Sequence, residues 1–572
     1  MKILPPISVE TRRLVPSPWD LLAAALVFGA IILISNASHD MIQPLAGLNQ
    51  HPIRLSPWAL PGYALRTALR MLVAMGCSLI FTFTYATWAA NSGRAGTLLV
   101  PILDILQSVP SLGFISVTVI FFLSLAPGKV LGAEFAAIFA IFTSQAWNMA
   151  FSFYQSLRTV PGELEEAGKM FGLSAWTRFW RIEAPYAMPA LVWNMMMSMS
   201  GGWFFVVAAE AISVGHTEIA LPGIGSYIAA AIATRNLTAI GWAIIAMLVV
   251  IVIFDQLLFR PLVVWSDRFR IDSEPGDEAA ESWALRMYRR ARLFEAVGTP
   301  FTRLMRWSYR LPAPKGAFKA EVLPTRVTDW VWYVIMAALA VLALWRVGHF
   351  LASTIGWHDV LDTFLRGIAT MARVVLLIGI ASLIWTPIGI YVGLRPRLTR
   401  IIQPVAQFLA AFPANIVFPL AVWGIVYWNL NPDIWLSPLM VLGTQWYILF
   451  NVIAGASALP RDLRDASTNM QLKGWLWWRS VGLPAVFPYY VTGAITASGG
   501  SWNAAIVAEV ASWGGKNLHA YGLGAYIADA TTAGDFHRIV LGIIMMGGFV
   551  VVANKLFWRP LYWYAERKYR LT

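Results

Sequence analysis

One polar segment occurs twice in this chain, and this duplication limits the folds that the chain can adopt. The first copy runs from Val160 to Pro189 (VPGELEEAGKMFGLSAWTRFWRIEAPYAMP), and the second runs from Leu459 to Pro488 (LPRDLRDASTNMQLKGWLWWRSVGLPAVFP). The copies align without a gap at an offset of 299 residues, which pairs like residues: Pro161 with Pro460, Glu166 with Asp465, Ala167 with Ala466, Trp176 with Trp475, and Pro185 with Pro484. The chain therefore has two equivalent halves, and each presents the same charged hairpin to water.

Long apolar runs surround both hairpins. Runs such as LLAAALVFGAIILI and GWAIIAMLVVIVIF contain no charged residue, and they approach or complete the roughly 20 residues needed to cross a bilayer core. The chain is 58% hydrophobic and only 13% charged, which is too apolar for an ordinary soluble enzyme. The sequence predicts an all-α polytopic membrane protein.

We expect about twelve transmembrane helices, arranged as two repeats of six. In the first half the expected spans are 20–36, 64–90, 102–124, 133–156, 188–213 and 239–260. In the second half they are 329–349, 366–392, 403–424, 437–456, 487–512 and 536–557. Because each half has an even number of spans, the two copies insert with the same orientation, as parallel repeats.

Basic residues set the expected orientation. The net charge of +13 is better explained by the enrichment of Lys and Arg in cytoplasmic loops than by nucleic-acid binding. An N-terminus inside the cell places seven basic residues of the first half in the cytoplasm: Arg12, Arg13, Arg94, Arg158, Lys169, Arg178 and Arg181. The polar N-terminal segment lacks the apolar core of a cleavable signal. We therefore expect an inner-membrane protein with both termini in the cytoplasm.

The repeat extends beyond the hairpins and defines three regions. The same offset pairs further residues: Gly201, Trp203, Glu210, Gly223, Gly225 and Tyr227 with Gly500, Trp502, Glu509, Gly522, Gly524 and Tyr526. Nearer the start of each half the offset becomes 303, and it pairs Thr67, Arg70, Pro101 and Pro110 with Thr370, Arg373, Pro404 and Pro413. We predict a first repeat at 1–262, a linker at 263–328 and a second repeat at 329–572.

The linker is the only long polar stretch of the chain. It mixes arginines with large apolar residues at loosely helical spacing: Trp283, Met287, Phe294, Phe301 and Trp307. This pattern favours a basic amphipathic segment that lies on the anionic inner leaflet. A regulatory or lipid-sensing element is the alternative.

The repeated hairpin resembles the EAA loop of bacterial ABC-importer permeases. That pattern is Glu-Ala-Ala, three residues, Gly, nine residues and Ile-x-Leu-Pro. The first copy supplies Glu166-Ala167-Gly168, then Gly172, then Ile182-Glu183-Ala184-Pro185. The second copy supplies Asp465-Ala466-Ser467 and Val481-Gly482-Leu483-Pro484, with Gln471 in place of the turn glycine and Gly474 three residues on.

The resemblance implies that each hairpin carries a coupling helix that docks on a cytoplasmic ABC ATPase subunit. The coupling residues would be Glu165, Glu166, Ala167, Gly168, Lys169 and Gly172 in the first half, with Arg464, Asp465, Ala466 and Ser467 in the second. By the same resemblance, the importer has two ATPase subunits, which bind the ATP and Mg, and a periplasmic solute-binding protein. This chain itself would hold no cofactor. Because Gln471 replaces glycine, we expect damage to the first loop to reduce coupling more than equivalent damage to the second.

The regions around the loops resemble one subgroup of these permeases. Thr67 with Arg70 and Thr370 with Arg373 precede a span in each half, and a Trp and a Glu follow each EAA loop. This arrangement is similar to permeases of the nitrate, sulfonate, taurine and bicarbonate type, over roughly 60–267 and 365–567, here as a duplicated single chain. The resemblance implies a small anion as solute without identifying it.

Polar residues within the spans are candidates for the transport pathway, because such residues are costly in a bilayer. Seven of them lie near helix-bending prolines or in the fifth span of a half: Asp104, Gln107, Asn194, Trp203, Gln407, Trp502 and Asn503. Pro110 and Pro413 should bend their helices. The pathway residues would face the interface between the halves, and the equally weighted alternative is polar contact between packed helices.

The two glutamates near the outer end of each fifth span suggest a gate. Glu210 and Glu509 would not attract an anion, so we expect each to cap a helix or to form an ion pair, with Arg70 and Arg373 as partners. The glycine-containing segments that follow, LPGIGSYIAAAI and AYGLGAYIADA, should form broken half-helices near the outer surface.

Other classes of function have weaker support. The phosphate-binding pattern G-x-x-x-x-G-K-[ST] does not occur in the chain, so ATP hydrolysis is expected in a partner rather than here. The seven histidines show no metal-ligand spacing, and we expect neither a metal nor a catalytic site. The single cysteine, Cys77, excludes an intramolecular disulfide. The alternative is an ion-coupled secondary transporter, in which parallel repeats also occur, and a membrane-embedded enzyme ranks third.

Overall fold

The computed structural model describes residues 19–22, 24–25, 27–29, 44, 53–108, 111–214, 217–269, 282–309 and 325–569. Within these ranges it leaves out the side chains of residues 104–105, 108, 111–117, 212–214, 217–218, 292–298, 301, 325–329 and 461. The predicted span at 20–36 therefore lies largely outside the described residues, as do Pro110 and the side chains of Asp104, Phe294 and Phe301.

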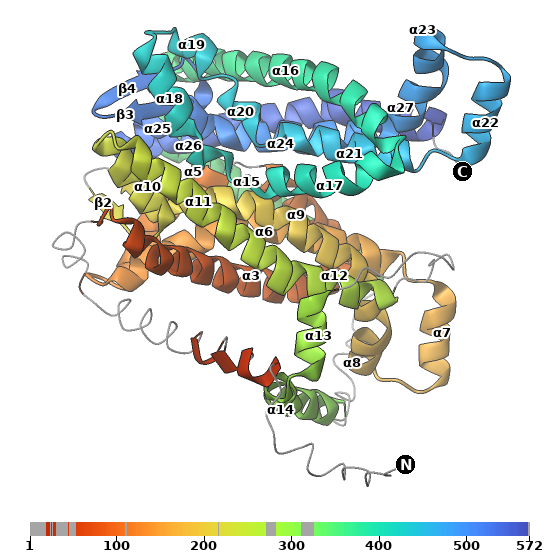
Figure 1. Cartoon of the computed structure of the whole chain (residues 1–572). Helices are drawn as coiled ribbons and strands as arrows, with labels where there is room; N and C mark the ends of the chain where they lie inside the picture. The colour runs from red at the N-terminus through yellow and green to blue at the C-terminus, as the bar shows by residue number, and fades with distance from the viewer. Residues whose placement is uncertain are drawn as a thin grey trace, which may run out of the picture.

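The described first half is a helical bundle with one short hairpin of strands (Figure 1). Its elements are η2 (Pro57–Ala59), α3 (Leu60–Asn91), α4 (Gly93–Ser108), α5 (Ser111–Leu125), α6 (Val130–Arg158), α7 (Gly162–Met170), α8 (Ala175–Arg178), η3 (Phe179–Glu183), α9 (Ala184–Glu210), β1 (Ala211–Val214), β2 (Thr217–Ala220), α10 (Ile224–Ala233), α11 (Leu237–Phe254), η4 (Asp255–Phe259), α12 (Arg260–Ser266) and η5 (Asp267–Phe269). Two further helices follow in the linker, α13 (Trp283–Arg290) and α14 (Arg292–Ser308).

The second half repeats this order, except that three shorter helices take the place of α6. Its elements are α15 (Thr325–Ala352), α16 (Trp357–Gly393), α17 (Pro396–Ala411), η6 (Ala414–Ile416), α18 (Phe418–Tyr427), α19 (Pro432–Trp435), α20 (Leu439–Leu442), α21 (Gln445–Ser457), α22 (Arg461–Asn469), α23 (Gly474–Trp477), η7 (Trp478–Gly482), α24 (Leu483–Ala508), β3 (Val510–Trp513), β4 (Lys516–His519), α25 (Leu523–Ala533), α26 (Phe536–Ala553), η8 (Asn554–Trp558) and α27 (Arg559–Tyr569). Even the π-helical turns recur at the offset of 299 residues, η3 with η7 and η4 with η8.

Seven helices among the described residues are long and apolar enough to cross a membrane, and the number rises to nine if two bent pairs each count as one span. The predicted total of twelve is therefore met only in part. The predicted span 102–124 is divided between α4 and α5, and 403–424 is divided between α17 and the pair η6 and α18, with a bend of 72°. This bend lies at Pro413, as expected, because proline removes a backbone donor and clashes with the preceding turn.

The predicted fifth spans, 188–213 and 487–512, are wrong at their C-terminal ends. Helix α9 ends at Glu210 and α24 at Ala508, and two antiparallel hairpins, β1–β2 and β3–β4, follow them. The N–H of Leu221 donates to the carbonyl of Glu210 over 2.9 Å, and the N–H of Ala520 does the same to Glu509. These bonds draw the chain back on itself, and β-branched residues such as Ile212 and Val510 favour the extended conformation.

Both halves point the same way in the bundle. Helices α7 and α22 project at one end, which we call the loop end, and the strand hairpins lie at the opposite end, which we call the hairpin end (Figure 1). Matched side-chain caps begin the last long helix of each half: Asn236 accepts from the N–H of Ala239 over 3.0 Å, and Asp535 accepts from the N–H of Arg538 over 3.1 Å. The helix caps and the direction of the helices therefore both repeat between the two halves.

Candidate functional site

The two EAA loops form nearly identical projections at the loop end (Figure 1). Pro161 precedes α7 and Pro460 precedes α22, and each helix has nine residues. Both helices end with the same hydrogen bonds: the N–H of Leu173 donates to Gly168 and that of Leu472 donates to Ser467, over 3.1 and 3.0 Å respectively. The backbone of the two loops is therefore conserved between the halves.

The turn after each helix uses a left-handed residue at the same position. Gly172 has a φ of 62° and Gln471 a φ of 52°, while Gly474 is also left-handed, at 56°. Glycine adopts this conformation freely, whereas a residue with a Cβ pays for it in conformational energy. The second loop thus keeps its turn at Gln471, and Gly474 adds a second left-handed position.

The predicted coupling residues divide into exposed and buried sets. Glu166, Lys169, Asp465 and Ala466 are exposed, Glu165, Ala167 and Arg464 are half-buried, Gly172 is exposed at the turn, and Gly168 and Ser467 are buried. A Cβ at Gly168 would lie 3.0 Å from Ile182 and 3.3 Å from Arg178, so α7 packs closely on the segment that follows it. Arg464 donates to the carbonyl of Ala456 over 3.1 Å, which ties α22 to α21.

Large apolar side chains at the tips of the loops were missed by the sequence prediction. Met170 is 87% exposed, Phe171 is 82% exposed and Met470 is 74% exposed. Exposed apolar side chains of this size would be stabilised by burial against another molecule. The signal in the sequence was their position within two residues before the turn residue of each loop.

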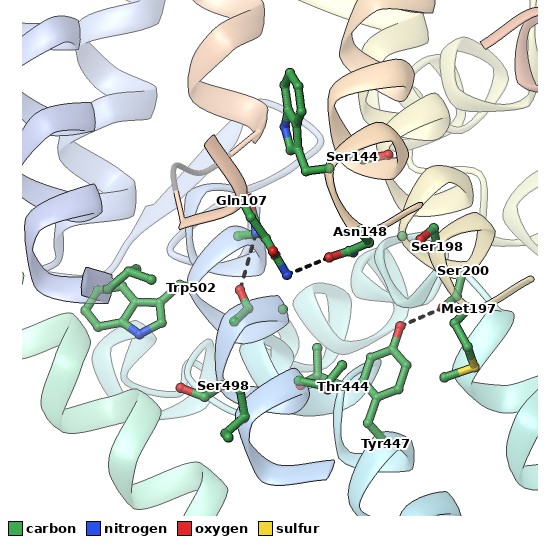
Figure 2. Close-up of a pocket in the computed structure, with 18 of the residues that line it drawn as sticks. Gln107, Ser144, Asn148, Met197, Ser198, Ser200, Thr444, Tyr447, Ser498 and Trp502 are labelled. Carbon is green, nitrogen blue, oxygen red and sulfur yellow. Dashed lines mark hydrogen bonds between the residues drawn. The ribbon is translucent and has the colours of Figure 1, made fainter. Parts of the chain in front are cut away.

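A cavity of about 1060 Å³ lies between the halves (Figure 2). Residues of α6 and α9 line it on one side, and residues of α20, α21, α24, η8 and α27 line it on the other. Amide and hydroxyl groups dominate its polar surface, and no Asp or Glu is among the described residues that line it. At its edge stand two exposed cations near the loop end, Lys555 and Arg559.

Four of the seven predicted pathway residues line this cavity: Gln107, Asn194, Trp502 and Asn503. Gln107 donates to Asn148 over 2.7 Å, and Asn194 donates to Ser152 over 2.7 Å. Trp203 lies instead in the core against Phe254, with ring centroids 5.0 Å apart. Gln407 donates to the sulfur of Met196 across the two halves, and Asp104 belongs to α4.

The halves are joined beside the cavity and beyond it. The hydroxyls of Ser200 and Tyr447 lie 3.0 Å apart (Figure 2), and Ser200 also donates to the carbonyl of Ala410. At the hairpin end, Arg235 donates to the carbonyl of Gly514 over 2.6 Å, and the N–H of Gly514 donates to Ile232. The first-half loop after α10 is therefore bonded to the β3–β4 hairpin of the second half.

The four predicted gate residues fall into two ion-pair networks at the hairpin end. In the first half, Arg70 binds Glu210 over 2.7 Å and holds Glu134 with two bonds of 2.6 Å each. Thr67 donates to Glu210 over 2.7 Å, and the N–H of Gly225 donates to the same carboxylate. Arg70 is 3% exposed and Glu210 is 0% exposed, so this network is closed to solvent.

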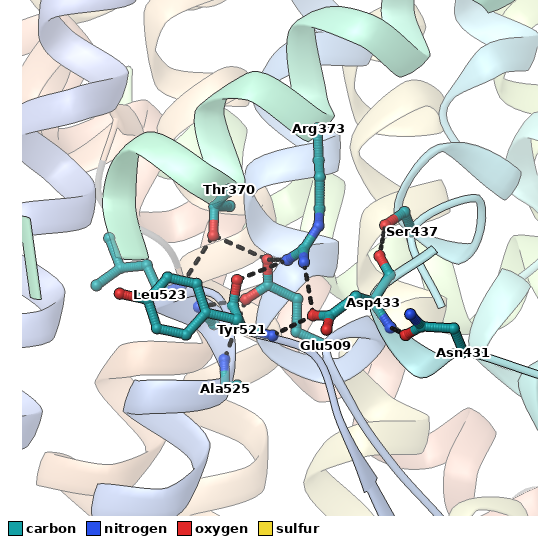
Figure 3. Close-up of polar contacts among 10 residues, drawn as sticks. Thr370, Arg373, Asn431, Asp433, Ser437, Glu509, Tyr521, Leu523 and Ala525 are labelled. Atoms are coloured by element: carbon teal, nitrogen blue, oxygen red, sulfur yellow. Dashed lines mark hydrogen bonds and ion pairs between the residues drawn. The ribbon is translucent and has the colours of Figure 1, made fainter. Parts of the chain in front are cut away.

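The second half builds the same network with a more open partner (Figure 3). Arg373 binds Glu509 over 3.2 Å and Asp433 over 3.0 Å, and Thr370 donates to Glu509 over 2.8 Å. The N–H of Gly524 donates to Glu509 over 2.7 Å. Here the Arg373 side chain is 16% exposed and that of Asp433 is 51% exposed.

The third acid of each network was missed by the sequence prediction. Glu134 and Asp433 are 299 residues apart, as are Glu210 and Glu509, so the repeat itself carried the signal. Glu134 lies at the very start of the predicted span 133–156, and Asp433 lies between two predicted spans. The networks pin helices that are distant in the sequence, α3, α6 and α9 in the first half and α16, α19 and α24 in the second.

Two glycines make room for the glutamates. A Cβ at Gly223 would lie 2.2 Å from the carboxylate of Glu210, and one at Gly522 would lie 2.2 Å from that of Glu509. Each carboxylate can therefore reach the N-terminal amides of α10 or α25, where helix dipoles favour negative charge. In the described part of the chain, no cluster of three or more His, Cys, Asp or Glu could hold a metal ion.

Comparison with known families agrees with this arrangement. Residues 82–263 and 385–565 each match the family described as "Binding-protein-dependent transport system inner membrane component", and together these matches cover more than half of the chain. The chain belongs to this family of ABC-importer permeases, as a duplicated, multi-pass membrane protein.

Individual relatives are similar over about one third of this chain. The bicarbonate transport system permease protein CmpB of Synechococcus elongatus is 30% identical over 34% of this chain and 66% of its own length. The nitrate import permease protein NrtB of Leptolyngbya laminosa is 25% identical over 35% of this chain and 72% of its own. The glycine betaine/proline betaine transport system permease protein ProW of Escherichia coli is 27% identical over 28% and 44%. These alignments cover one half of the duplicated chain or less.

Proposed function

We propose that this protein is the permease subunit of an ATP-driven importer in a bacterial inner membrane, with both termini in the cytoplasm. The observation that carries the proposal is the placement of two matched EAA loops at one end of the bundle, beside a cavity lined by both halves. A single fused chain would in this way supply both halves of the transport pathway, and the halves would alternate between states open to either side.

Two cytoplasmic ABC ATPase subunits would dock on α7 and α22 and would bind the ATP and Mg. Exposed charges, Glu166 and Lys169 in the first loop and Asp465 in the second, would form the polar contacts. Met170, Phe171 and Met470 would fill apolar pockets of the partner, because such side chains gain most from being removed from water.

The solute that we propose is a small anion of the nitrate, sulfonate, taurine or bicarbonate type. The polar lining of the cavity is neutral or basic. Its amide and hydroxyl groups can donate hydrogen bonds to an anion, and no carboxylate among the described lining residues would repel it. The names of the bicarbonate and nitrate relatives support this class. A periplasmic binding protein would deliver the solute and would determine much of the selectivity.

The two ion-pair networks would serve as structural anchors of the outer gate. They lie at the hairpin end, where the halves are also joined through Arg235 and Gly514, while the cavity reaches toward Lys555 and Arg559 near the loop end. This arrangement would correspond to a state closed outside and open inside. The gate residues Arg70, Glu210, Arg373 and Glu509 would hold the hairpin-end helices together while the halves move.

The test is reconstitution with the partner ATPase and the binding protein, followed by measurement of uptake and ATP hydrolysis. Glu166→Lys should reduce uptake per ATP hydrolysed by about tenfold, since reversing an interface charge costs on the order of 1.4 kcal/mol or more. Asp465→Lys should also reduce it, but by less, because damage to the second loop is expected to matter less. Glu163→Lys, on an exposed residue of α7 outside the predicted coupling set, is the matched control and should lose less.

The outcome also separates this proposal from gradient-driven transport. Uptake that continues without an ATPase and collapses when the proton or sodium gradient is dissipated would contradict the proposal. A binding screen of the receptor protein against nitrate, bicarbonate, taurine and alkyl sulfonates would then identify the solute, and a receptor that binds only cations would exclude the anion class.

A further inference from the structure

We propose that the linker helices α13 and α14 hold the first EAA loop in position, and that the second loop is less constrained. This inference rests on the proposed coupling role of the loops. It concerns residues 282–309, which the family matches at 82–263 and 385–565 do not include. The reasons are the contacts that the linker helices make at their two ends.

The start of the linker helices is fixed to the last long helix of the first half. Tyr288 donates to the carbonyl of Leu257 over 2.6 Å, and burial raises the pKa of its phenol. Trp283 donates to Gln256 over 3.4 Å. Met287 is fully buried between these contacts. The α13 segment is therefore packed on η4, and it does not lie only on the lipid surface.

The other end reaches the first EAA loop. The indole N–H of Trp176 donates to the hydroxyl of Ser308 over 3.0 Å, at the end of α14. The guanidinium of Arg181 lies over the ring of Tyr309, 5.2 Å from its centroid, which is a favourable cation–π distance. The linker thus contacts both α8 and η3 of the loop.

These contacts lead directly to α7. Trp176 packs on Trp180 with ring centroids 5.7 Å apart, and Arg178, on the same short helix as Trp176, binds Glu183 over 2.8 Å. Gly168 of α7 in turn lies against Arg178 and Ile182. A movement of η4 can therefore be passed through α13 and α14 to the segment that supports the first coupling helix.

The second loop keeps the tryptophan of this chain of contacts but lacks its other matched parts. Trp475, the equivalent of Trp176, is 73% exposed, compared with 49% for Trp176. Ser480 stands where Arg181 stands in the first loop, and Gly482 stands in place of Glu183. In Figure 1 the linker helices lie beside the first half, far from α22 and α23. Ser308, Tyr309, Trp176 and Arg181 are accordingly positioning residues for one loop.

The direct test is the mobility of a nitroxide label on the full chain in lipid nanodiscs. The label is placed at Glu163→Cys in α7 or at the equivalent Asp462→Cys in α22, in a Cys77→Ser background that removes the single native cysteine. Both label positions are exposed. The double substitution Ser308→Ala with Tyr309→Leu should raise the mobile fraction about fivefold at position 163, because one hydrogen bond and one cation–π contact are lost. At position 462 it should leave the spectrum unchanged.

A conservative variant separates positioning from misfolding. Ser308→Ala with Tyr309→Phe keeps the aromatic face for Arg181, and it should restore most of the immobilised signal at position 163. An unchanged spectrum at position 163, or equal changes at positions 163 and 462, would overturn the inference.

Transport measurements distinguish this inference from the proposed function. In the reconstituted importer, the Ser308→Ala, Tyr309→Leu variant should lower uptake per ATP hydrolysed by about two- to fivefold, and the Tyr309→Phe version should recover it. If Glu166→Lys and Asp465→Lys uncouple the importer but the linker variant does not, the positioning role fails and the proposed function stands. If neither loop substitution uncouples it, the proposed function fails, while label mobility still decides the linker contact.

Discussion

The ion-pair networks of the two halves have the same geometry in different surroundings. Arg70 holds two acids and is 3% exposed, whereas Arg373 holds two acids with its side chain 16% exposed and with Asp433 51% exposed. The difference follows from the third acid: Glu134 lies on the long straight helix α6, and Asp433 lies on the short helix α19, where the second half breaks the equivalent helix. The two halves therefore share the same ion-pair contacts. The burial of the paired side chains, which sets the energy of these contacts, differs between the halves.

The largest expected difference between the halves comes from removing the arginines. Arg70→Met leaves Glu134 and Glu210 buried without a counter-charge, and it should lower the free energy of unfolding by about 3–5 kcal/mol. Arg373→Met also leaves the buried Glu509 without its counter-charge, but Asp433 stays in contact with solvent, so the loss should be smaller, about 2–3 kcal/mol. Thermal unfolding in detergent, followed by tryptophan fluorescence, measures both losses. Equal losses would show that exposure of Asp433 does not weaken its network.

Substitutions of the glycines beside the two glutamates should destabilise both halves to a similar extent. Gly223→Ala and Gly522→Ala each place a methyl group within 2.2 Å of a buried carboxylate. Each should destabilise the protein by about 1–3 kcal/mol, since overpacking forces neighbouring atoms to shift. Gly201→Ala is the control, because a Cβ there would meet no atom within 4 Å. A loss in only one half, by the same unfolding measurement, would contradict the close match of the two sites.

The third acid of each network, Glu134 or Asp433, should also contribute differently to the free energy of unfolding in the two halves. The difference should be smaller than for the arginines. Glu134→Gln weakens the two-bond contact with Arg70 inside a closed site, and it should cost about 1–3 kcal/mol. Asp433→Asn changes an exposed ion pair, and it should cost less than about 1 kcal/mol. Raising the salt concentration tests the same point, since exposed pairs are screened and buried pairs are not. Salt should therefore destabilise the Glu134→Gln protein, which retains the Asp433 pair, more than the Asp433→Asn protein.

The smallest effect is expected at the turns of the EAA loops. Gly172→Gln gives the first loop the residue of the second, and it should cost about 1 kcal/mol because a Cβ is disfavoured in the left-handed region. Gln471→Gly should gain up to about 1 kcal/mol. Hydrogen exchange at the amides of Leu173 and Leu472 reports these changes locally. If Gln471→Gly destabilises the second loop, the glutamine side chain must make a contribution that outweighs the strain.

Most of the helical framework followed from the sequence. Long apolar runs predicted the positions of α3, α6, α11, α15, α16 and α26, and the offset of 299 residues predicted matched halves. The pairing of Arg70 with Glu210 and of Arg373 with Glu509 was also expected. The outer ends of the fifth spans were not predicted correctly, because apolar β-branched residues suit a helix and a short strand equally well by composition.

Other features depended on contacts between distant segments. The offset of 299 residues marks Glu134 and Asp433 as equivalent, but only the tertiary structure shows that α6 and α19 bring them to Arg70 and Arg373. Trp203 matched Trp502 in sequence, yet Trp203 packs on Phe254 in the core while Trp502 lines the cavity. Both side chains are 2% exposed and both pack on a phenylalanine, Phe254 or Phe549, so the halves differ only in whether this tryptophan also lines the cavity.

The sequence by itself determined the class of this protein, its duplication and the two EAA loops, because these depend on local composition, periodicity and spacing. Only the tertiary structure decided how deeply each ion pair is buried, which polar residues face the cavity, and that Trp176 rather than Trp475 contacts the linker. The physical reason is that desolvation and packing depend on every neighbour in space, and most of those neighbours are far away in the chain.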